Sequence, residues 1–352
     1  MKIITYNGKL IFEGDIASGN SYRKDYLDSI NRFIQKKYDE SFALRDKFME
    51  RITEDQEKYR KDFIDMIGQP VFPYPDYIPD AKSEFIGKDE FCNIYRLKIE
   101  VMPAFWFYGI FMIPHGIKRA PLVIAQHGGG STPEICSEFL GKSNYNFFTK
   151  RALEKGMAVF APQLLLWKFD IDTGEQKTDI DIHFNRGGID GKLKHIGLSI
   201  TGLEVFCIRR SVDYINSLDY IDENRTAMMG LSYGGYFSLY TAAADKRIKS
   251  IYAAGFFNDR TKIVFEDWRY KNSVNTFCDA EIIALCAPRR LQIDVGKTDS
   301  VFDYIPSIEE GKRAAQFYTQ FNSADNFRFN LWDGGHRFDE SGTGFDFFFD
   351  GI

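Results

Sequence analysis

A serine stands between glycines at a fixed spacing in the stretch MMGLSYGGYF, residues 228–237. Gly230 lies two residues before Ser232 and Gly234 lies two residues after it, behind an apolar run and ahead of a helix-like segment. A serine in a sharp turn from strand to helix has a strained backbone, and small residues at these two positions avoid clashes as the helix packs on its strand. The spacing therefore predicts that Ser232 is a nucleophile; the alternative is an ordinary glycine-rich turn.

A serine hydroxyl is a poor nucleophile at neutral pH, so it needs a base beside it and an acid that orients this base. The segment LQIDVGKTDSVFD offers three aspartates. Asp294 lies inside a predicted strand, from which its carboxylate cannot easily swing to a site, whereas Asp299 lies in the loop just after the strand. We therefore predict that Asp299 is the acid, with Asp303 as the second choice and a solvated loop aspartate as the alternative.

The base is predicted in the segment LWDGGHRFDE, where His336 follows a strand-like run and two glycines. The glycines let the backbone bring the imidazole across the edge of a sheet. His336 is the last of five histidines, so the three candidates occur in the order serine, aspartate, histidine. A surface loop histidine is the alternative interpretation.

Hydrolysis also needs donors for the oxyanion that develops on the substrate. The backbone N–H of Tyr233, the residue after the nucleophile, is the first predicted donor, and Gly129 or Gly130 in the segment AQHGGGS is the second. Glycines there allow a carbonyl oxygen to approach closely. His127 in the same segment is predicted to hold the loop by hydrogen bonds.

Three further residues at strand ends are candidates for substrate binding. Trp167 ends the run APQLLLW, and Asn258 and Arg260 follow the run AAGFF. For each of them core packing, helix capping or a surface ion pair is at least as good an interpretation. An aromatic and apolar lining would suit a small acyl group and many others.

Strand-like and helix-like segments alternate from residue 94 onward, which predicts an α/β fold with a mostly parallel central sheet and helices on both faces. In such a sheet the loops at the carboxyl ends of the strands converge, so residues far apart in the sequence can form one site. Residues 1–80 are predicted to be an N-terminal helical extension and a proline-rich linker, because apolar residues recur every three or four positions between residues 21 and 67. Residues 81–352 are predicted to be the catalytic domain, with a polar insertion at 168–200 that could be a lid.

The bulk composition excludes several classes of function. The net charge of −5 and the absence of a long basic run argue against a nucleic-acid partner. No apolar run approaches the length of a membrane span, and the N-terminus lacks the apolar core of a secretory signal. The five cysteines are widely spaced without a CxxC pair, which predicts reduced, mostly buried thiols, no metal site and a cytoplasmic location.

With these motifs in place, the sequence resembles the α/β-hydrolase superfamily. The segments from GLEVFCIRRSVDYINSLDYIDENRTAMMGLSYGGYF to YAAGFFNDR, together with APRRLQIDVGKTDSVFD and GGHRFD, resemble bacterial esterases of the acetyl xylan esterase and dienelactone-hydrolase-like group. The resemblance covers roughly residues 85 to 350. It implies hydrolysis of carboxylic esters by Ser232, Asp299 and His336, without a metal or an organic cofactor, on a small-molecule ester that could be an acetyl or other short acyl ester of a carbohydrate. A homo-oligomer through the N-terminal helices is left open.

Two other readings are kept. The segment Ser-Tyr-Gly-Gly-Tyr also resembles the nucleophile segment of prolyl-oligopeptidase-type enzymes, which would make the chain a serine peptidase or amidase. Those enzymes place a propeller before the hydrolase domain, and the N-terminal residues here are helical and too few for one. The third reading is a non-catalytic binding protein on a hydrolase scaffold, a class that usually lacks one member of the catalytic triad.

Overall fold

The central feature of the computed structural model is one mixed sheet. The structure describes residues 2–14, 16–70, 77–139, 141–166, 168–169, 176–177 and 185–352. Within these ranges nine strands pair in the order β13-β12-β11-β10-β6-β7-β5-β4-β3. The six strands from β13 to β7 are parallel, and β5, β4 and β3 are antiparallel. The strands are β3 Asp80–Lys88, β4 Cys92–Met102, β5 Phe105–Pro114, β6 Ala120–Gln126, β7 Ala158–Pro162, β10 Ile221–Leu231, β11 Ile248–Ala254, β12 Arg290–Gly296 and β13 Phe327–Trp332.

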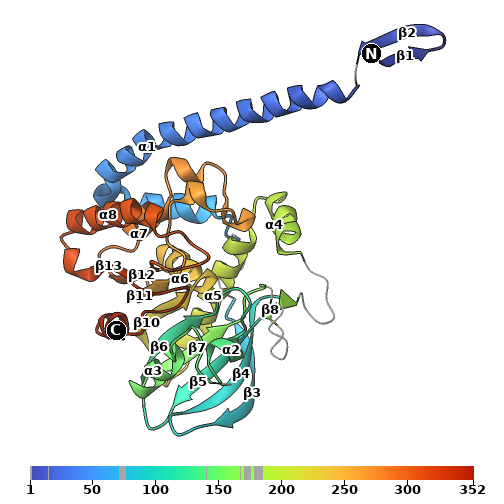
Figure 1. Ribbon diagram of the computed structural model, residues 1–352. Helices are drawn as coiled ribbons and strands as arrows, with labels where there is room; N and C mark the ends of the chain where they lie inside the picture. Colours follow the sequence, from blue (N-terminus) through green and yellow to red (C-terminus); the bar gives the residue numbers. More distant parts are fainter. Residues whose placement is uncertain are drawn as a thin grey trace.

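The middle strands are the short apolar runs of the sequence. Every residue of β6 and of β7 is buried, as expected of parallel strands that are covered on both faces. Helices form a layer on each side of the sheet (Figure 1). The fold predicted from the sequence, a mostly parallel sheet with helices on both faces, is therefore confirmed.

Two apolar clusters show which helices cover which face. The larger cluster contains residues of α1 (Gly19–Met66), α5 (Ile200–Asn216), α6 (Tyr233–Ala244), α7 (Asp279–Ala284) and α8 (Ile305–Gln320). The smaller cluster contains residues of α2 (Pro133–Cys136), α3 (Phe148–Glu154) and α9 (Thr343–Phe349). All five cysteines are buried and unpaired, as predicted. No helix in the described part of the chain is both long and apolar enough to cross a membrane.

Helix α1 is a single helix of 48 residues, where the sequence left one or two open. Its C-terminal half packs into the larger cluster through Phe48, Ile52 and Phe63. Its N-terminal half extends away from the globular body and ends at a hairpin of β1 (Lys2–Tyr6) and β2 (Lys9–Gly14), which the sequence reading did not identify (Figure 1).

Buried polar contacts hold the C-terminal half of α1 on the domain. The guanidinium of Arg45 donates to Glu281 at 2.9 Å and to Glu310 at 2.7 Å. Further along the helix, the amide of Gln56 donates to the carbonyl oxygens of Ala284 and Ala287 at 3.0 and 2.7 Å. These contacts fix the helix to α7 and α8, so this half is part of the folded body.

Several sequence predictions fall partly outside the described residues. Within the predicted linker, residues 71–76 lie outside them, and strand β3 already begins at Asp80. Within the insertion at 168–200, residues 170–175 and 178–184 lie outside, while β8 (Lys168–Phe169), β9 (Gln176–Lys177) and α4 (Arg186–Lys194) are described. The division into two parts at residue 80 and the lid role stay predictions.

Candidate active site

Ser232 occupies the turn between β10 and α6. Its φ of 61° and ψ of −123° are strained for a residue with a side chain. The neighbouring strand fixes this conformation, because the backbone N–H of Ser232 donates to the carbonyl oxygen of Ala254 at 2.8 Å, and its carbonyl accepts from Tyr236 at 2.9 Å. The serine therefore stands at the carboxyl end of a central strand and at the N-terminus of a helix.

The glycines around Ser232 are a steric requirement of this turn. A Cβ on Gly230 would lie 2.3 Å from the carbonyl carbon of Gly234, and a Cβ on Gly234 would lie 2.1 Å from the carbonyl oxygen of Gln126. Neither contact is compatible with a side chain, because the atoms met are backbone. The glycines flank Ser232 at this spacing because α6 packs closely on β10 and β6.

Asp299 and His336 meet at the carboxyl ends of β12 and β13. Nδ1 of His336 lies 2.8 Å from Oδ2 of Asp299, whose other oxygen accepts from the backbone N–H groups of Val301 and Phe302 at 2.7 and 3.1 Å. The Asp299 side chain is 2% exposed and that of His336 is 21% exposed. A buried carboxylate with all these donors is a rigid support for an imidazole that solvent or substrate can reach.

Backbone contacts bring these two loops together and towards Ser232. Because β12 and β13 are parallel neighbours, their following loops leave the same edge, where the N–H of Thr298 donates to the carbonyl of Gly334 at 2.9 Å. The imidazole of His336 lies against Gly255, since a Cβ added there would be 3.3 Å from both Cε1 and Nδ1. Gly255 follows Ala254, the residue that accepts from the Ser232 backbone. The three predicted triad residues are thus gathered at one edge of the sheet.

The loop after β6 lies against the serine. A Cβ on Gly128 would be 3.1 Å from Cβ of Ser232, and the N–H of Gly128 donates to the hydroxyl of Tyr145 at 2.7 Å. Gly128 therefore lies close to the serine, but its N–H already has a partner. Gly129 and Gly130, the predicted donors, follow directly, and Gly130 has a φ of +70° that suits only glycine well.

His127 holds the loop after β6 by hydrogen bonds, as the sequence predicted. The N–H of Leu164 can only donate, so Nε2 of His127, 3.0 Å away, accepts, and the proton on Nδ1 points to the carbonyl of Gly128 at 2.9 Å. Burial lowers the pKa of His127 to about 4, so the ring stays neutral. This histidine is fully buried and ties the loop after β6 to the loop after β7.

The side chain of Tyr233 ties the residue after Ser232 to a buried ionic cluster. Its hydroxyl donates to Oδ1 of Asp267 at 3.0 Å. Arg186 in α4 pairs with the other oxygen of Asp267 at 2.8 Å and with Glu204 in α5 at 2.8 Å. All three charged side chains are at most 8% exposed. Burial opposes the charge of Arg186, but Glu204 and Asp267 outweigh it and raise the pKa of the guanidinium, so the cluster is ionic.

The candidates for substrate binding have internal partners. Asn258 donates its backbone N–H to Asp279 at 2.9 Å and its amide to the carbonyl of Asp303 at 2.6 Å. Arg260 is buried, pairs with Asp279 and lies 4.9 Å from the ring centre of Trp268. Contact of either with a substrate stays a prediction.

The other candidates are placed as follows. Trp167 lies outside the described residues. Asp303, the second choice for the acid, accepts from the backbone of Ile305, while Asp294 is buried within β12 and accepts from Gln292, Asn330 and Tyr252. Of these three aspartates, Asp299 is the one that hydrogen-bonds to His336.

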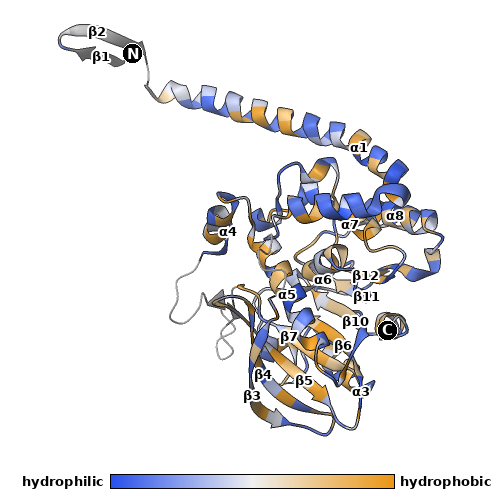
Figure 2. Cartoon of the chain, turned by 180° about the vertical axis from the view of Figure 1, so that it is seen from behind, coloured by the Kyte–Doolittle hydropathy of each residue, from blue (hydrophilic) through white to orange (hydrophobic). Residues whose placement is uncertain are grey.

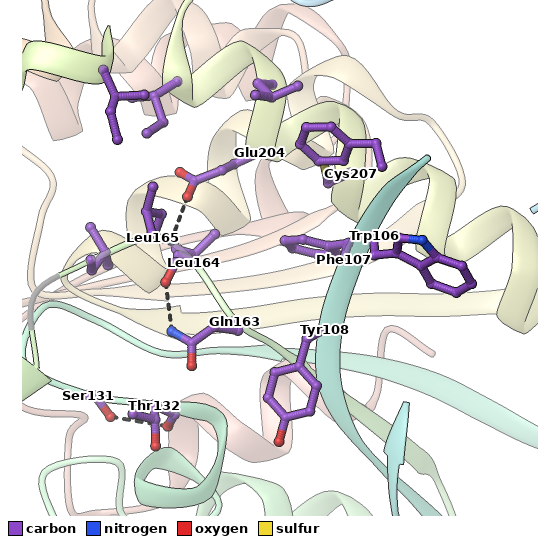
Figure 3. Close-up of a pocket in the computed structure, with 15 residues that line it drawn as sticks. Trp106, Phe107, Tyr108, Ser131, Thr132, Gln163, Leu164, Leu165, Glu204 and Cys207 are labelled. Atoms are coloured by element: carbon purple, nitrogen blue, oxygen red, sulfur yellow. Dashed lines mark hydrogen bonds between the residues drawn. The ribbon is translucent and has the colours of Figure 1, made fainter. Parts of the chain in front are cut away.

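A cavity of about 620 Å³ opens beside the loop after β6 (Figure 3). Ser131 and Thr132 lie at one end and Glu204 and Cys207 at the other, with the start of β5 and the loop after β7 between them. Its walls are largely aromatic and aliphatic and include Phe105, Trp106, Phe107, Tyr108, Leu164, Leu165, Leu166, Ile189, Ile200 and Leu203. Such a lining suits a bulky group with apolar faces.

The sequence reading missed the residues that position the site from behind. No local motif marks Tyr145, Arg186, Glu204 or Asp267. Arg186 lies in the predicted polar insertion and Glu204 lies in the segment GLEVFCIRR that carries part of the family resemblance, but neither was predicted to contribute to the site. Among the described residues, no group of three or more histidine, cysteine, aspartate or glutamate side chains is arranged to hold a metal ion.

Comparisons with known proteins give the same architecture. Residues 208–277 match the prolyl oligopeptidase family. No curated protein sequence matches the chain. A solved structure of a putative acetyl xylan esterase from Bacteroides fragilis has a TM-score of 0.61 at 14% identity and covers 81% of this chain and 76% of its own.

Two further solved structures are similar over most of both chains. The glucuronoyl esterase from Solibacter usitatus has a TM-score of 0.59 at 12% identity and covers 84% of this chain and 91% of its own. Acetyl xylan esterase 1 from Thermoanaerobacterium has a TM-score of 0.56 at 17% identity, and the match covers 84% of this chain and 93% of that chain. At such low identity the likeness shows a shared fold.

Proposed function

We propose that this chain, which has the α/β-hydrolase fold, is a serine hydrolase that cleaves carboxylic esters through Ser232, His336 and Asp299. The observation that carries the proposal is the hydrogen bond of 2.8 Å between His336 and Asp299, at the sheet edge where the strained Ser232 also stands. A structural role for these residues would not require this combination of a strained serine, an accessible imidazole and a buried carboxylate.

The proposed mechanism follows from which nitrogen of His336 is engaged. Nδ1 donates its proton to Asp299, so Nε2 carries the lone pair and acts as the base. Oγ of Ser232 attacks the acyl carbon while its proton moves to Nε2, and the C–O bond then breaks as the alcohol leaves with that proton. Water attacks the acyl-enzyme by the same route, which releases the acid and restores the serine. Asp299 stabilises the imidazolium that forms in each half.

The developing oxyanion would be held by the N–H of Tyr233 and by an N–H of Gly129 or Gly130. The first lies at the start of α6, where the helix dipole favours negative charge. The cluster of Arg186, Glu204 and Asp267 supports this donor, because it anchors the Tyr233 side chain.

The substrate class is proposed from the cavity and from the fold relatives. The relatives are described as acetyl xylan esterases and glucuronoyl esterases, so acetyl or other short acyl esters of carbohydrates are the first class to test. The aromatic walls beside the loop after β6 would hold the apolar faces of a sugar ring or of an aryl alcohol. A panel that varies acyl length and alcohol, with acetylated sugars and a glucuronate methyl ester, would rank these classes.

The decisive experiment is replacement of the nucleophile. Ser232→Ala should reduce hydrolysis of p-nitrophenyl acetate to background and abolish labelling by a fluorophosphonate, while circular dichroism stays unchanged. Retained turnover in the alanine variant would overturn the assignment. A folded wild type that neither labels nor hydrolyses any ester would instead support the reading as a binding protein.

Hydrolysis of peptides or amides is the second candidate, favoured by the match of residues 208–277 to the prolyl oligopeptidase family. The match covers only the segment around the nucleophile. Comparing aminoacyl-p-nitroanilides with p-nitrophenyl esters separates the two activities, since both would depend on Ser232. We also propose that the chain acts in the cytoplasm, because its five cysteines are buried and unpaired.

A further inference from the structure

A stripe of apolar side chains is exposed on the part of α1 that extends from the body. We define the α1 stripe as Tyr22, Tyr26, Leu27, Ile30, Phe33 and Ile34. Its exposed fractions run from 38% at Ile30 to 74% at Tyr22. Each of these residues lies three or four positions from another member of the stripe, so they share one face of the helix. Figure 2 shows apolar residues alternating with polar ones along this protruding segment.

The stripe continues the face by which α1 binds its own domain. Leu27 and Ile34 lie on the same heptad row as Ser41 and Phe48, which are buried against the body at 3% and 2% exposure. The helix therefore has one continuous contact face, of which the domain covers only the C-terminal part.

An uncovered face of this kind is unfavourable in water. Together the six side chains leave on the order of 600 Å² of largely apolar surface exposed, which approaches the roughly 800 Å² that each partner contributes to a standard interface. A helix that packs on nothing also gains little stability from propensity alone. A patch of this size on one element indicates a binding surface.

We infer that the α1 stripe binds the α1 stripe of a second copy of this chain, with the two helices antiparallel. The charges at the two ends of the stripe favour this arrangement. Arg23 stands four residues before Leu27, at the N-terminal end of the stripe, and Glu40 stands seven residues after Phe33, at its C-terminal end. A twofold axis near residues 31 and 32 places Arg23 of each copy opposite Glu40 of the other, whereas parallel helices would place like charges together.

The same register places the central apolar residues opposite one another. Ile30 of one copy meets Phe33 of the other on both sides of the axis, and Lys37, which pairs with Glu40 of its own helix at 2.6 Å, comes opposite Tyr26. Arg23 and Glu40 lie about 25 Å apart along the axis at 1.5 Å per residue, so the overlap spans most of the protruding segment. It ends where Ser41 and Arg45 enter the body, which keeps the two globular bodies at opposite ends of the pair.

The test exchanges the charges of Arg23 and Glu40 and measures the molecular mass of each variant in solution. Arg23→Glu and Glu40→Arg each create two like-charged contacts in an antiparallel pair, and each should weaken the dimer about tenfold or more. The double variant R23E/E40R restores opposite charges and should restore the dimer. Arg32→Glu is the matched control, because Arg32 lies about 200° around the helix from Ile30 and faces away from the stripe. Multi-angle light scattering at micromolar protein measures the mass, and circular dichroism confirms that each variant is folded.

A dimeric wild type, two weakened single variants and a restored double variant support the antiparallel pair. A monomeric wild type overturns the proposal, as does a double variant that stays monomeric or a control that is as weak as R23E. A monomer that instead co-sediments with phosphatidylglycerol vesicles would assign the stripe to a membrane surface. Ester hydrolysis has no part in this readout, so the proposal stands or fails separately from the proposed function.

Discussion

The hydroxyl of Tyr233 donates a hydrogen bond of 3.0 Å to Oδ1 of Asp267, and this bond ties the residue beside Ser232 to a buried ionic cluster. Asp267 in turn pairs with Arg186, and Arg186 pairs with Glu204. Residues of α4, α5 and the loop after β11 therefore help to position the backbone N–H of Tyr233, the predicted oxyanion donor. The position of one backbone N–H is therefore set by residues from three distant segments.

Tyr233→Phe should lower kcat roughly tenfold with little change in KM, because the ring loses its anchor while Ser232, His336 and Asp299 stay in place. Loss of the hydroxyl also leaves a buried carboxylate oxygen short of a donor, which costs about 1–3 kcal/mol of unfolding free energy. The matched control is Tyr236→Phe, a buried tyrosine of the same helix whose hydroxyl contacts Tyr270 and Thr201. Equal effects of both variants on kcat would contradict the positioning role.

Arg186→Met should destabilise the fold by about 3–5 kcal/mol, because Glu204 and Asp267 would then be buried without a counter-charge. Urea unfolding measures the loss. Replacing one of the two carboxylates as well, in R186M/E204Q, should recover part of it, since fewer charges remain unpaired. If the double variant is less stable than the single one, repulsion between the carboxylates is not the cause.

Asp299→Asn should reduce kcat by about 10³–10⁴-fold without loss of fold, because an amide cannot hold the Nδ1–H tautomer of His336 in the same way. Asp303→Asn should have little effect, since Asp303 contacts the start of α8 and not the histidine. Initial rates with p-nitrophenyl acetate compare the two variants. A larger loss in D303N than in D299N would reverse the assignment of the acid.

The anchor of α1 should make stability depend on pH through Glu310. Burial raises the pKa of Glu310 from 4.5 to about 7, with Arg45 opposing and Glu281 adding to the shift. The folded carboxyl therefore holds its proton more tightly than the unfolded one, so its stabilising contribution is complete below pH 4.5 and is lost as the pH rises towards 7. This loss is on the order of 3 kcal/mol.

Urea unfolding of the wild type and of Glu310→Gln between pH 5 and 7.5 tests this dependence. The glutamine keeps an acceptor for Arg45 but cannot titrate, so the decline with pH should be smaller in the variant. Identical slopes would assign the pH dependence to other groups.

Much of the fold follows from local patterns. The strand-like runs, the helix-like segments and the order in which they alternate predict a mostly parallel sheet, and the structure confirms it. The strand β3 and the hairpin of β1 and β2 were missed, because their residues carry no clear apolar alternation. The single long helix α1 was left undecided, since a periodic pattern does not show whether a helix breaks within it.

The sequence by itself determined the turn at Ser232, because the glycines are required by contacts with residues a few positions away and with the neighbouring strand β6. It also determined that Asp299 and His336 follow strands. Only the tertiary structure decided that these two loops meet, that Asn258 and Arg260 have internal partners, and that Arg186, Glu204 and Asp267 gather behind Tyr233. The physical reason is that a buried ion pair depends on which strands become neighbours and on how their helices pack. Neither the strand order nor the helix packing can be read from the spacing of residues along the chain.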